Sequence, residues 1–219
     1  MNPEPHQWIL LCLLGGWTAV DGASWGQFMI SRPFVAAVAA GAIVGAPLQA
    51  AQLGVVLEAL HLRVLPIGAA RYPESGPAAV VGGATSAVLA GTSGLLTAAV
   101  FVLIWEWVGG ETIRQLRNWN APSPEGDLRT PARIEREHLR AVGLDFGRGA
   151  LLVLAGVPLL LGIAVSTQPL LGGFGNASAL LLAASLAAGL ASAVGMFGIA
   201  RARFALAGVA LGLLFVALR

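Results

Sequence analysis

The sequence predicts an all-α integral membrane protein, a polytopic bundle with broken or re-entrant helices in its N-terminal third. Of its 219 residues, 57% are hydrophobic and only 11% are charged, whereas a soluble domain carries about 25% charged residues. Two long runs, residues 78–105 and 149–200, contain no charge at all. A helix needs about 20 apolar residues to cross a bilayer. The first run therefore predicts one membrane helix and the second run predicts two.

The first 80 residues contain shorter apolar stretches that polar residues interrupt. Residues 8–20 give only a short run before Asp21, and residues 34–57 are interrupted at Pro47. Backbone polar groups cannot stay unpaired in lipid, so a broken helix must pack within protein or line a cavity. Such breaks are typical of substrate sites in transporters. The sequence therefore predicts that function is concentrated in the N-terminal third.

Beyond residue 148, the chain reads as further membrane helices. Apolar runs cover residues 149–165 and 177–200, with a glycine-rich turn between them. A last run, residues 204–218, is short for a membrane span. We expect a single membrane domain over residues 1–219. Its parts are a substrate-site half (1–109), an amphipathic cytoplasmic segment (110–148) and further membrane helices (149–219).

The segment 110–148 is hydrophilic and contains seven of the 13 arginines. Arginine-rich loops of this length usually stay in the cytoplasm. Thr130 and Pro131 are typical of a helix start, and the residues that follow predict a short surface helix. This helix either docks a partner or only connects two membrane helices, and the sequence leaves both readings open.

Several function classes find no support in the composition. Cys12 is the single cysteine, which excludes an intramolecular disulfide. The three histidines, His6, His61 and His138, are isolated in the sequence, so we expect no metal site, no cofactor and no catalytic residue. His61 is expected to lie at a membrane interface. The net charge of +2 is too small to indicate nucleic-acid binding.

A block of spaced residues runs from Gln27 to Glu74. Its elements are Gln27, Ser31-Arg32-Pro33, Gly41, Gly45, Gly54, Glu58, Gly68-Ala69-Ala70, Pro73 and Glu74. In this block the chain resembles the mannose/sorbose-type IIC family of the bacterial phosphotransferase system (PTS), and the resemblance extends over roughly residues 7–105. The chain departs from the family pattern at Ala46 and Ala50, where the family often has aspartate and glycine.

This resemblance implies a sugar-translocating IIC permease subunit that moves a hexose or related sugar inward by an elevator-type movement. It also implies a multi-pass protein of the bacterial inner (plasma) membrane. A histidine on a separate IIB phosphocarrier protein would phosphorylate the sugar. A IID membrane subunit would pair with this chain, in a trimer of IIC–IID pairs.

The substrate-binding residues that we expect are Gln27, Ser31, Arg32, Glu58 and Glu74. A sugar hydroxyl both donates and accepts hydrogen bonds, which carboxylates and amides can satisfy. Charged groups inside a membrane are normally paired or functional. Arg32 therefore either contacts substrate or anchors the predicted hairpin by pairing with a carboxylate. Glu74 either reads a hydroxyl or is a solvated loop carboxylate.

Two other functions remain open at this point. One is a transport-inactive membrane scaffold or regulator of the same fold, which the departures at Ala46 and Ala50 keep in view. The other is a PTS-independent solute carrier that uses the same cavity. Gly41 and Gly45 form a small-xxx-small pattern, which predicts close helix packing and no ligand contact.

Overall fold

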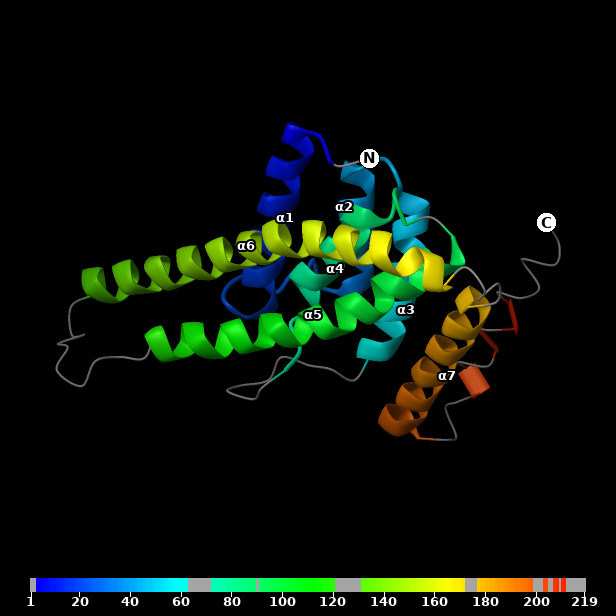
Figure 1. Cartoon of the computed structure of the whole chain (residues 1–219). Helices are drawn as coiled ribbons and strands as arrows, with labels where there is room; N and C mark the ends of the chain where they lie inside the picture. The colour runs from blue at the N-terminus through cyan, green and yellow to red at the C-terminus, as the bar shows by residue number, and fades with distance from the viewer. Residues whose placement is uncertain are drawn as a thin grey trace.

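The computed structural model describes residues 3–62, 72–89, 91–120, 131–171 and 177–198, with a few more between 203 and 211. In this part of the chain the regular secondary structure is entirely helical, which confirms the predicted all-α class (Figure 1). The helices are α1 (Pro5–Ala23), α2 (Pro33–Ile43), α3 (Pro47–His61), α4 (Ser75–Thr85), α5 (Thr92–Trp119), α6 (Pro131–Leu171) and α7 (Ala177–Phe197).

The predicted break at Pro47 is confirmed, and α2 and α3 form a helical hairpin. Pro33 and Pro47 each occupy the first turn of their helix, where a missing N–H leaves no donor unpaired. A Cβ on Gly41 would lie 2.3 Å from the Cβ of Ala50, so glycine is needed for the two helices to pack this closely. Gly45 is different from the prediction: with a φ of +78° it forms the turn, and a Cβ added to it would meet no atom within 4 Å.

The prediction of one helix over residues 78–105 is wrong, because the chain breaks between α4 and α5. The Thr85 hydroxyl donates to the carbonyl of Gly82 at 2.9 Å, and the Ser86 hydroxyl donates to the carbonyl of Gly83 at 2.6 Å. Hydroxyls that bond back to the preceding turn compete with helix continuation. Gly91, with a φ of +102°, then starts α5. Counting charges could not reveal a break made by small uncharged residues.

The predicted surface helix and the apolar run 149–165 belong to one helix, α6, so they are not separate elements as the sequence predicted. Its 41 residues make it about 60 Å long. Its first ten residues are exposed, and the change from polar to apolar side chains does not interrupt the helical hydrogen bonding. Likewise Gly110–Trp119 continues α5 as helix, while residues 121–130 lie outside the described part.

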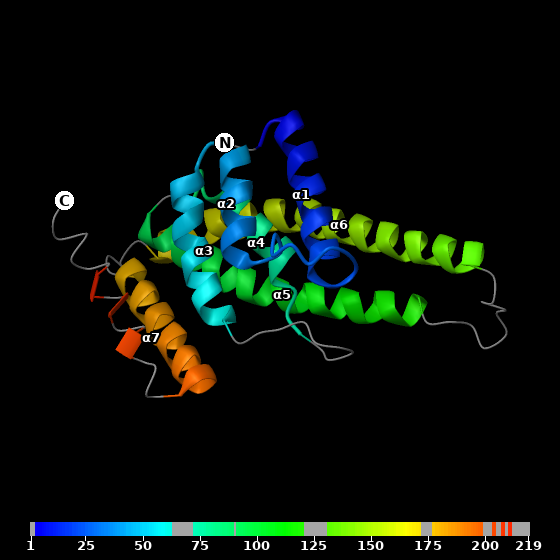
Figure 2. The ribbon, with the colours of Figure 1, turned by 180° about the vertical axis from the view of Figure 1, so that it is seen from behind.

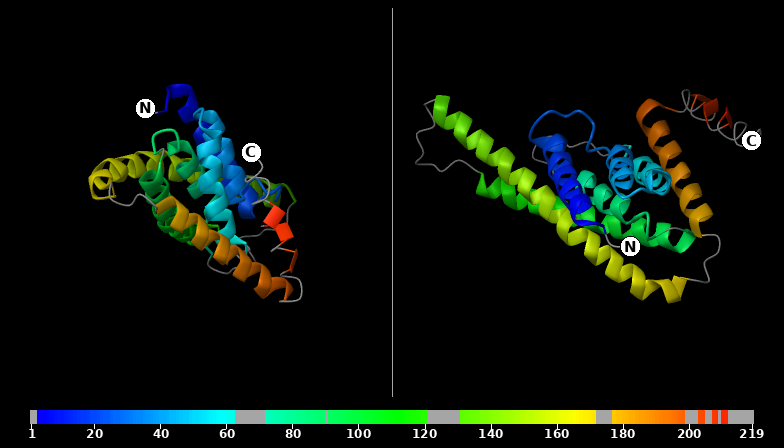
Figure 3. Two further views of the ribbon diagram at one scale, coloured as in Figure 1. Left: turned by 90° about the vertical axis from the view of Figure 1, so that its right-hand side faces the viewer. Right: turned by 90° about the horizontal axis from the view of Figure 1, so that it is seen from above.

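Helices α5 and α6 lie side by side and extend past α1 toward the 121–130 connection (Figures 1 and 2). Helix α1 crosses α6 closely, since a Cβ on Gly149 would lie 2.4 Å from the carbonyl oxygen of Gly15. The short helices α2, α3 and α4 pack together beside this crossing, and α7 packs on α3 and α5 (Figure 3). The buried core lies where these groups meet and includes Leu53, Val80 and Val153.

Two of the described helices are long and apolar enough to cross a membrane, Ser93–Trp119 within α5 and Pro131–Thr167 within α6. Helix α2 and the Ala183–Phe197 part of α7 are apolar but shorter. The run 177–200 is confirmed as helix up to Phe197. The predicted last run, residues 204–218, lies mostly outside the described residues, as does most of the glycine-rich turn before α7.

Candidate functional site

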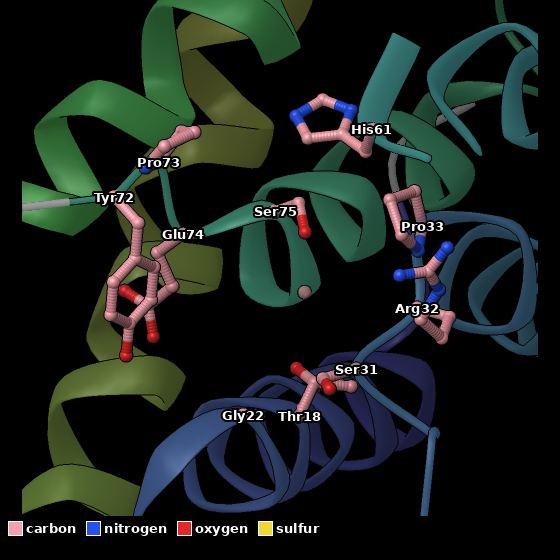
Figure 4. A pocket seen from close by; sticks show the side chains of 11 residues that line it. Thr18, Gly22, Ser31, Arg32, Pro33, His61, Tyr72, Pro73, Glu74 and Ser75 are labelled. Carbon is pink, nitrogen blue, oxygen red and sulfur yellow. The ribbon is translucent and has the colours of Figure 1, made fainter. Parts of the chain in front are cut away.

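A cavity of about 60 Å³ lies where the second half of α1, the start of α2, the end of α3 and the start of α4 meet (Figure 4). It therefore lies at the chain breaks that the sequence pointed to. Its lining is Thr18, Gly22, Ser31, Arg32, Pro33, His61, Tyr72, Pro73, Glu74, Ser75 and Gly76. Small-molecule sites are typically ~300–1,000 Å³, so the cavity in this conformation has room for a few waters and not for a sugar.

Arg32 and Glu58 pair at one side of this cavity. The Nε of Arg32 donates to a Glu58 carboxylate oxygen at 2.8 Å, and its Nη2 donates to the same oxygen. The second carboxylate oxygen accepts the backbone N–H of Phe34 at 3.2 Å, in the first turn of α2. A carboxylate is favourable there because the first N–H groups of a helix lack intrahelical partners. Glu58, on α3, therefore fixes both Arg32 and the start of α2.

Asp21, near the end of α1, shapes the loop that leads to Arg32. Its carboxylate is buried and accepts the backbone N–H of Phe28 and that of Ser31, the latter at 2.8 Å. Within this loop Gln27 and Met29 adopt positive φ values of 54° and 68°, which are uncommon outside glycine. The Gln27 side chain is exposed and does not line the cavity.

Glu74, which precedes α4, is 6% exposed, so the reading of a solvated loop carboxylate is wrong. Both of its carboxylate oxygens accept from the guanidinium of Arg148 on α6. Arg148 also donates to Asp145 at 2.6 Å and to the hydroxyl of Thr112 at 2.9 Å. This bidentate pairing ties the start of α4 to α6.

His61 is buried, contrary to the expectation that it lies at an interface. Its Nε2 lies 2.7 Å from a carboxylate oxygen of Glu106 on α5, and its Nδ1 lies 2.7 Å from the carbonyl oxygen of Leu57. The backbone carbonyl of Glu106 in turn accepts the N–H of Glu74 at 2.9 Å. Sequence spacing could not reveal this contact, because His61 and Glu106 lie on helices that are distant in the chain.

Tyr72 is a further residue that sequence reasoning missed. Its buried hydroxyl has no hydrogen-bond partner in the described part of the chain, and its side chain lines the cavity (Figure 4). Burial raises the pKa of the Tyr72 phenol, so this hydroxyl keeps its proton and can both donate and accept. The available signal was its position: it is the only tyrosine in the chain and stands directly before Pro73 and Glu74.

The structure thus brings together three of the five predicted site residues: Ser31, Arg32 and Glu74 line one cavity. Glu58 contacts the cavity through Arg32, and Gln27 lies apart. Among the described residues, no three His, Cys, Asp or Glu side chains gather as a metal site would need. Hydroxyls, a guanidinium and a carboxylate around one space are suited to binding a small polyhydroxylated molecule.

Comparison with known proteins supports this picture. No curated protein and no solved structure matches the chain. The sequence model of one family, described as the PTS system sorbose-specific IIC component, matches residues 5–113. This region contains α1 to α4 and most of α5, and therefore every residue that lines the cavity. Through this match over its N-terminal half, the chain belongs to the sorbose-specific IIC family of the phosphotransferase system, whose members are membrane components that serve in sugar transport.

Proposed function

We propose that this chain is the IIC permease subunit of a bacterial PTS that moves a hexose or related sugar inward across the plasma membrane. The family supports a sugar permease subunit and implies partner PTS components such as IID and IIB. In this proposal the chain crosses the inner membrane several times and works in a trimer of IIC–IID pairs. A IIB phosphocarrier phosphorylates the sugar on release, which adds charge and traps the product inside.

The observation that carries the proposal is the set of side chains around the cavity. Ser31, Arg32 and Glu74 line it together with Tyr72, whose hydroxyl has no hydrogen-bond partner among the described residues. A sugar hydroxyl would supply the hydrogen bond that this phenol lacks. Glu58 positions Arg32 and has a less direct role. Gln27 would contact substrate only after the loop that precedes α2 moves inward.

The size of the cavity supports a moving transporter. At about 60 Å³ it must expand before it admits a sugar. Four helix ends border it, and the α2–α3 hairpin is short enough to enter a membrane from one side and return as a re-entrant unit. In the proposed elevator-type cycle this hairpin and its neighbours move as a body and carry the sugar between the two faces.

Replacing Tyr72 by phenylalanine tests the site with little risk to the fold. The phenol oxygen bonds to no group of the residues that the structure describes, so Tyr72→Phe should leave stability unchanged. Losing one sugar hydrogen bond should raise the KM for uptake about tenfold. The measurement is uptake of a panel of labelled hexoses by cells that co-express the chain with its IID and IIB partners.

The matched control is Ser166→Ala, since that hydroxyl donates only to a carbonyl of its own helix, Gly162, and lies far from the cavity lining in sequence. An unchanged KM in Tyr72→Phe would remove Tyr72 from the site. Absence of uptake for every hexose would favour the transport-inactive scaffold. Uptake that persists without IIB would favour a PTS-independent carrier.

A further inference from the structure

The contact between His61 and Glu106 connects the α2–α3 hairpin to α5. His61 is the last residue of the α2–α3 hairpin and lines the cavity, whereas Glu106 is on α5 and is not part of the lining. Their side chains are 5% and 4% exposed, and the two facing atoms are 2.7 Å apart. At this distance two facing lone pairs would repel each other, so one of the two atoms carries a proton.

The number of protons follows from the partners of the imidazole. The carbonyl oxygen of Leu57 can only accept, so the 2.7 Å contact with Nδ1 places a proton on Nδ1. The ring can then contact Glu106 through Nε2 in two ways. Either an imidazolium faces a carboxylate, or a neutral imidazole faces a protonated carboxyl group. Both descriptions contain one shared proton, and both leave the pair without net charge.

Among the residues that the structure describes, the surroundings do not offer another counter-charge. Glu58, one turn before His61 on α3, is paired with Arg32. Glu74, whose amide bonds to the Glu106 carbonyl, is paired with Arg148. Tyr72, on the same cavity, is a neutral phenol. The helices α2, α4 and α7 contain no charged residue. Loss of the shared proton would therefore leave one buried, uncompensated negative charge, which is strongly unfavourable.

We propose that His61 and Glu106 form a proton-binding site that holds the hairpin against α5, and that opening the cavity releases this proton. In the open state each group faces water, and the imidazole titrates alone with the ordinary histidine pKa of about 6.5. Above pH 6.5 the separated groups together bind one proton fewer than the closed pair. Opening is therefore favoured by rising pH above 6.5, by up to tenfold per pH unit, and hardly depends on pH just below 6.5.

The consequence for transport rests on the proposed function, because a sugar can enter only an expanded cavity. Under that function, sugar binding and proton release are coupled, so the pH on each side of the membrane biases the step in which the hairpin moves. The proton site itself does not depend on the identity of the substrate, and the following experiment uses no sugar.

Cavity opening can be measured by thiol labelling of the full-length chain in lipid nanodiscs. The protein carries Cys12→Ala with Ser75→Cys, which lines the cavity, and the reference carries Ala132→Cys, which is exposed on α6. The labelling rate of the cavity thiol is divided by that of the exposed reference thiol, which cancels the intrinsic pH dependence of a thiol. We expect this ratio to rise above pH 6.5 with a limiting slope of one decade per pH unit.

Two variants test whether the His61–Glu106 pair causes this pH dependence. Glu106→Gln pairs with neutral His61 without a shared proton, so the ratio should become independent of pH above pH 6.5. Glu111→Gln changes a half-buried carboxylate farther along the same helix, where it pairs with Arg114, and should keep the slope of the parent protein. A flat ratio in the parent protein would overturn the proposal, as would an equal slope in Glu106→Gln.

Nitrogen-15 NMR of the histidines supplies a second measurement on the unmodified chain. His6 and His138 are exposed and give reference signals in the same spectra. His61 should keep its Nδ1 proton and hold the shared proton to a pH distinctly above 6.5, the ordinary histidine value. Loss of the shared proton from His61 near pH 6.5, or a bare Nδ1, would overturn the proposal. Absence of sugar uptake in a protein with the expected slope would count against the proposed function alone.

Discussion

Two arginine–carboxylate networks border the cavity, and they differ in burial and in the elements they join. Arg32 and Glu58 are 23% and 25% exposed, and they connect the start of α2 to α3 within the hairpin. Arg148 and Glu74 are 11% and 6% exposed, and with Asp145 they connect the start of α4 to α6. Water therefore screens the first network and largely fails to reach the second.

This difference separates two parts of the cavity wall. The Arg32–Glu58 pair can respond to a ligand, whereas the Arg148–Glu74 network holds the wall in place. Breaking a buried network leaves uncompensated charge, whereas a partly exposed pair can exchange its partner for water. Arg148 also lies outside the region that matches the IIC family, residues 5–113. The second half of the chain thus stabilises a cavity that the first half lines.

The largest effect is expected for Arg148→Met. Methionine fills the apolar part of the space but leaves Glu74 and Asp145 buried without a cation. Removing one member of a buried ion pair typically costs about 3–5 kcal/mol. We expect a strongly lowered midpoint of thermal unfolding in detergent and little monodisperse protein.

Two further variants test whether charge is the cause. Arg140→Met removes an exposed arginine from the same helix, where it pairs only with Glu137, and should change nothing measurable. Adding Glu74→Gln and Asp145→Asn to Arg148→Met should recover part of the lost stability. If it recovers none, the arginine acts through its packing, and the two networks do not differ in the way described.

Much of the fold could be predicted because chain breaks and apolar runs are local signals. Pro47 gave the hairpin, and the uncharged run 177–200 gave α7. The break between α4 and α5 could not be predicted, since it depends on hydroxyls bonding to their own helix and on a left-handed Gly91 inside an uncharged run. The continuity of α6 was missed because polarity changes along it while its hydrogen bonding does not.

The site was predictable only where its residues lie in one block of sequence. Ser31, Arg32 and Glu74 converge as that block folds. Their partners come from elsewhere: Glu106 from α5 and Arg148 from α6. Such contacts depend on how α5 and α6 cross the short helices, and no spacing rule encodes that crossing. Gln27 stays a prediction, since its side chain is exposed and does not line the cavity in this conformation.

A smaller effect is expected for Ser24→Ala, which tests whether the loop before α2 depends on the buried network. The Ser24 hydroxyl donates to Asp145, so it links the end of α1 to α6. Asp145 keeps its pairing with Arg148 after the change, and the loss should be about 1–2 kcal/mol. This loss is measured by thermal unfolding of Ser24→Ala, with Ser166→Ala as the control. A loss as large as that of Arg148→Met would mean that the hydroxyl, rather than the arginine, governs the network.

The smallest effect on stability and the sharpest effect on function should occur together in Glu58→Gln. Arg32 is partly exposed, and the amide oxygen of glutamine can still accept the N–H of Phe34 or one guanidinium hydrogen, so the expected loss of stability is below about 1 kcal/mol. Under the proposed function, Arg32 loses the carboxylate that orients it toward the cavity, and sugar uptake should fall to background while membrane insertion is retained. Uptake and the unfolding midpoint should be measured on the same preparations. Normal uptake would remove Glu58 from the site. A pair that responds to a ligand must be one that the fold can do without. A stability loss near that of Arg148→Met would therefore show that the two networks play the same structural role.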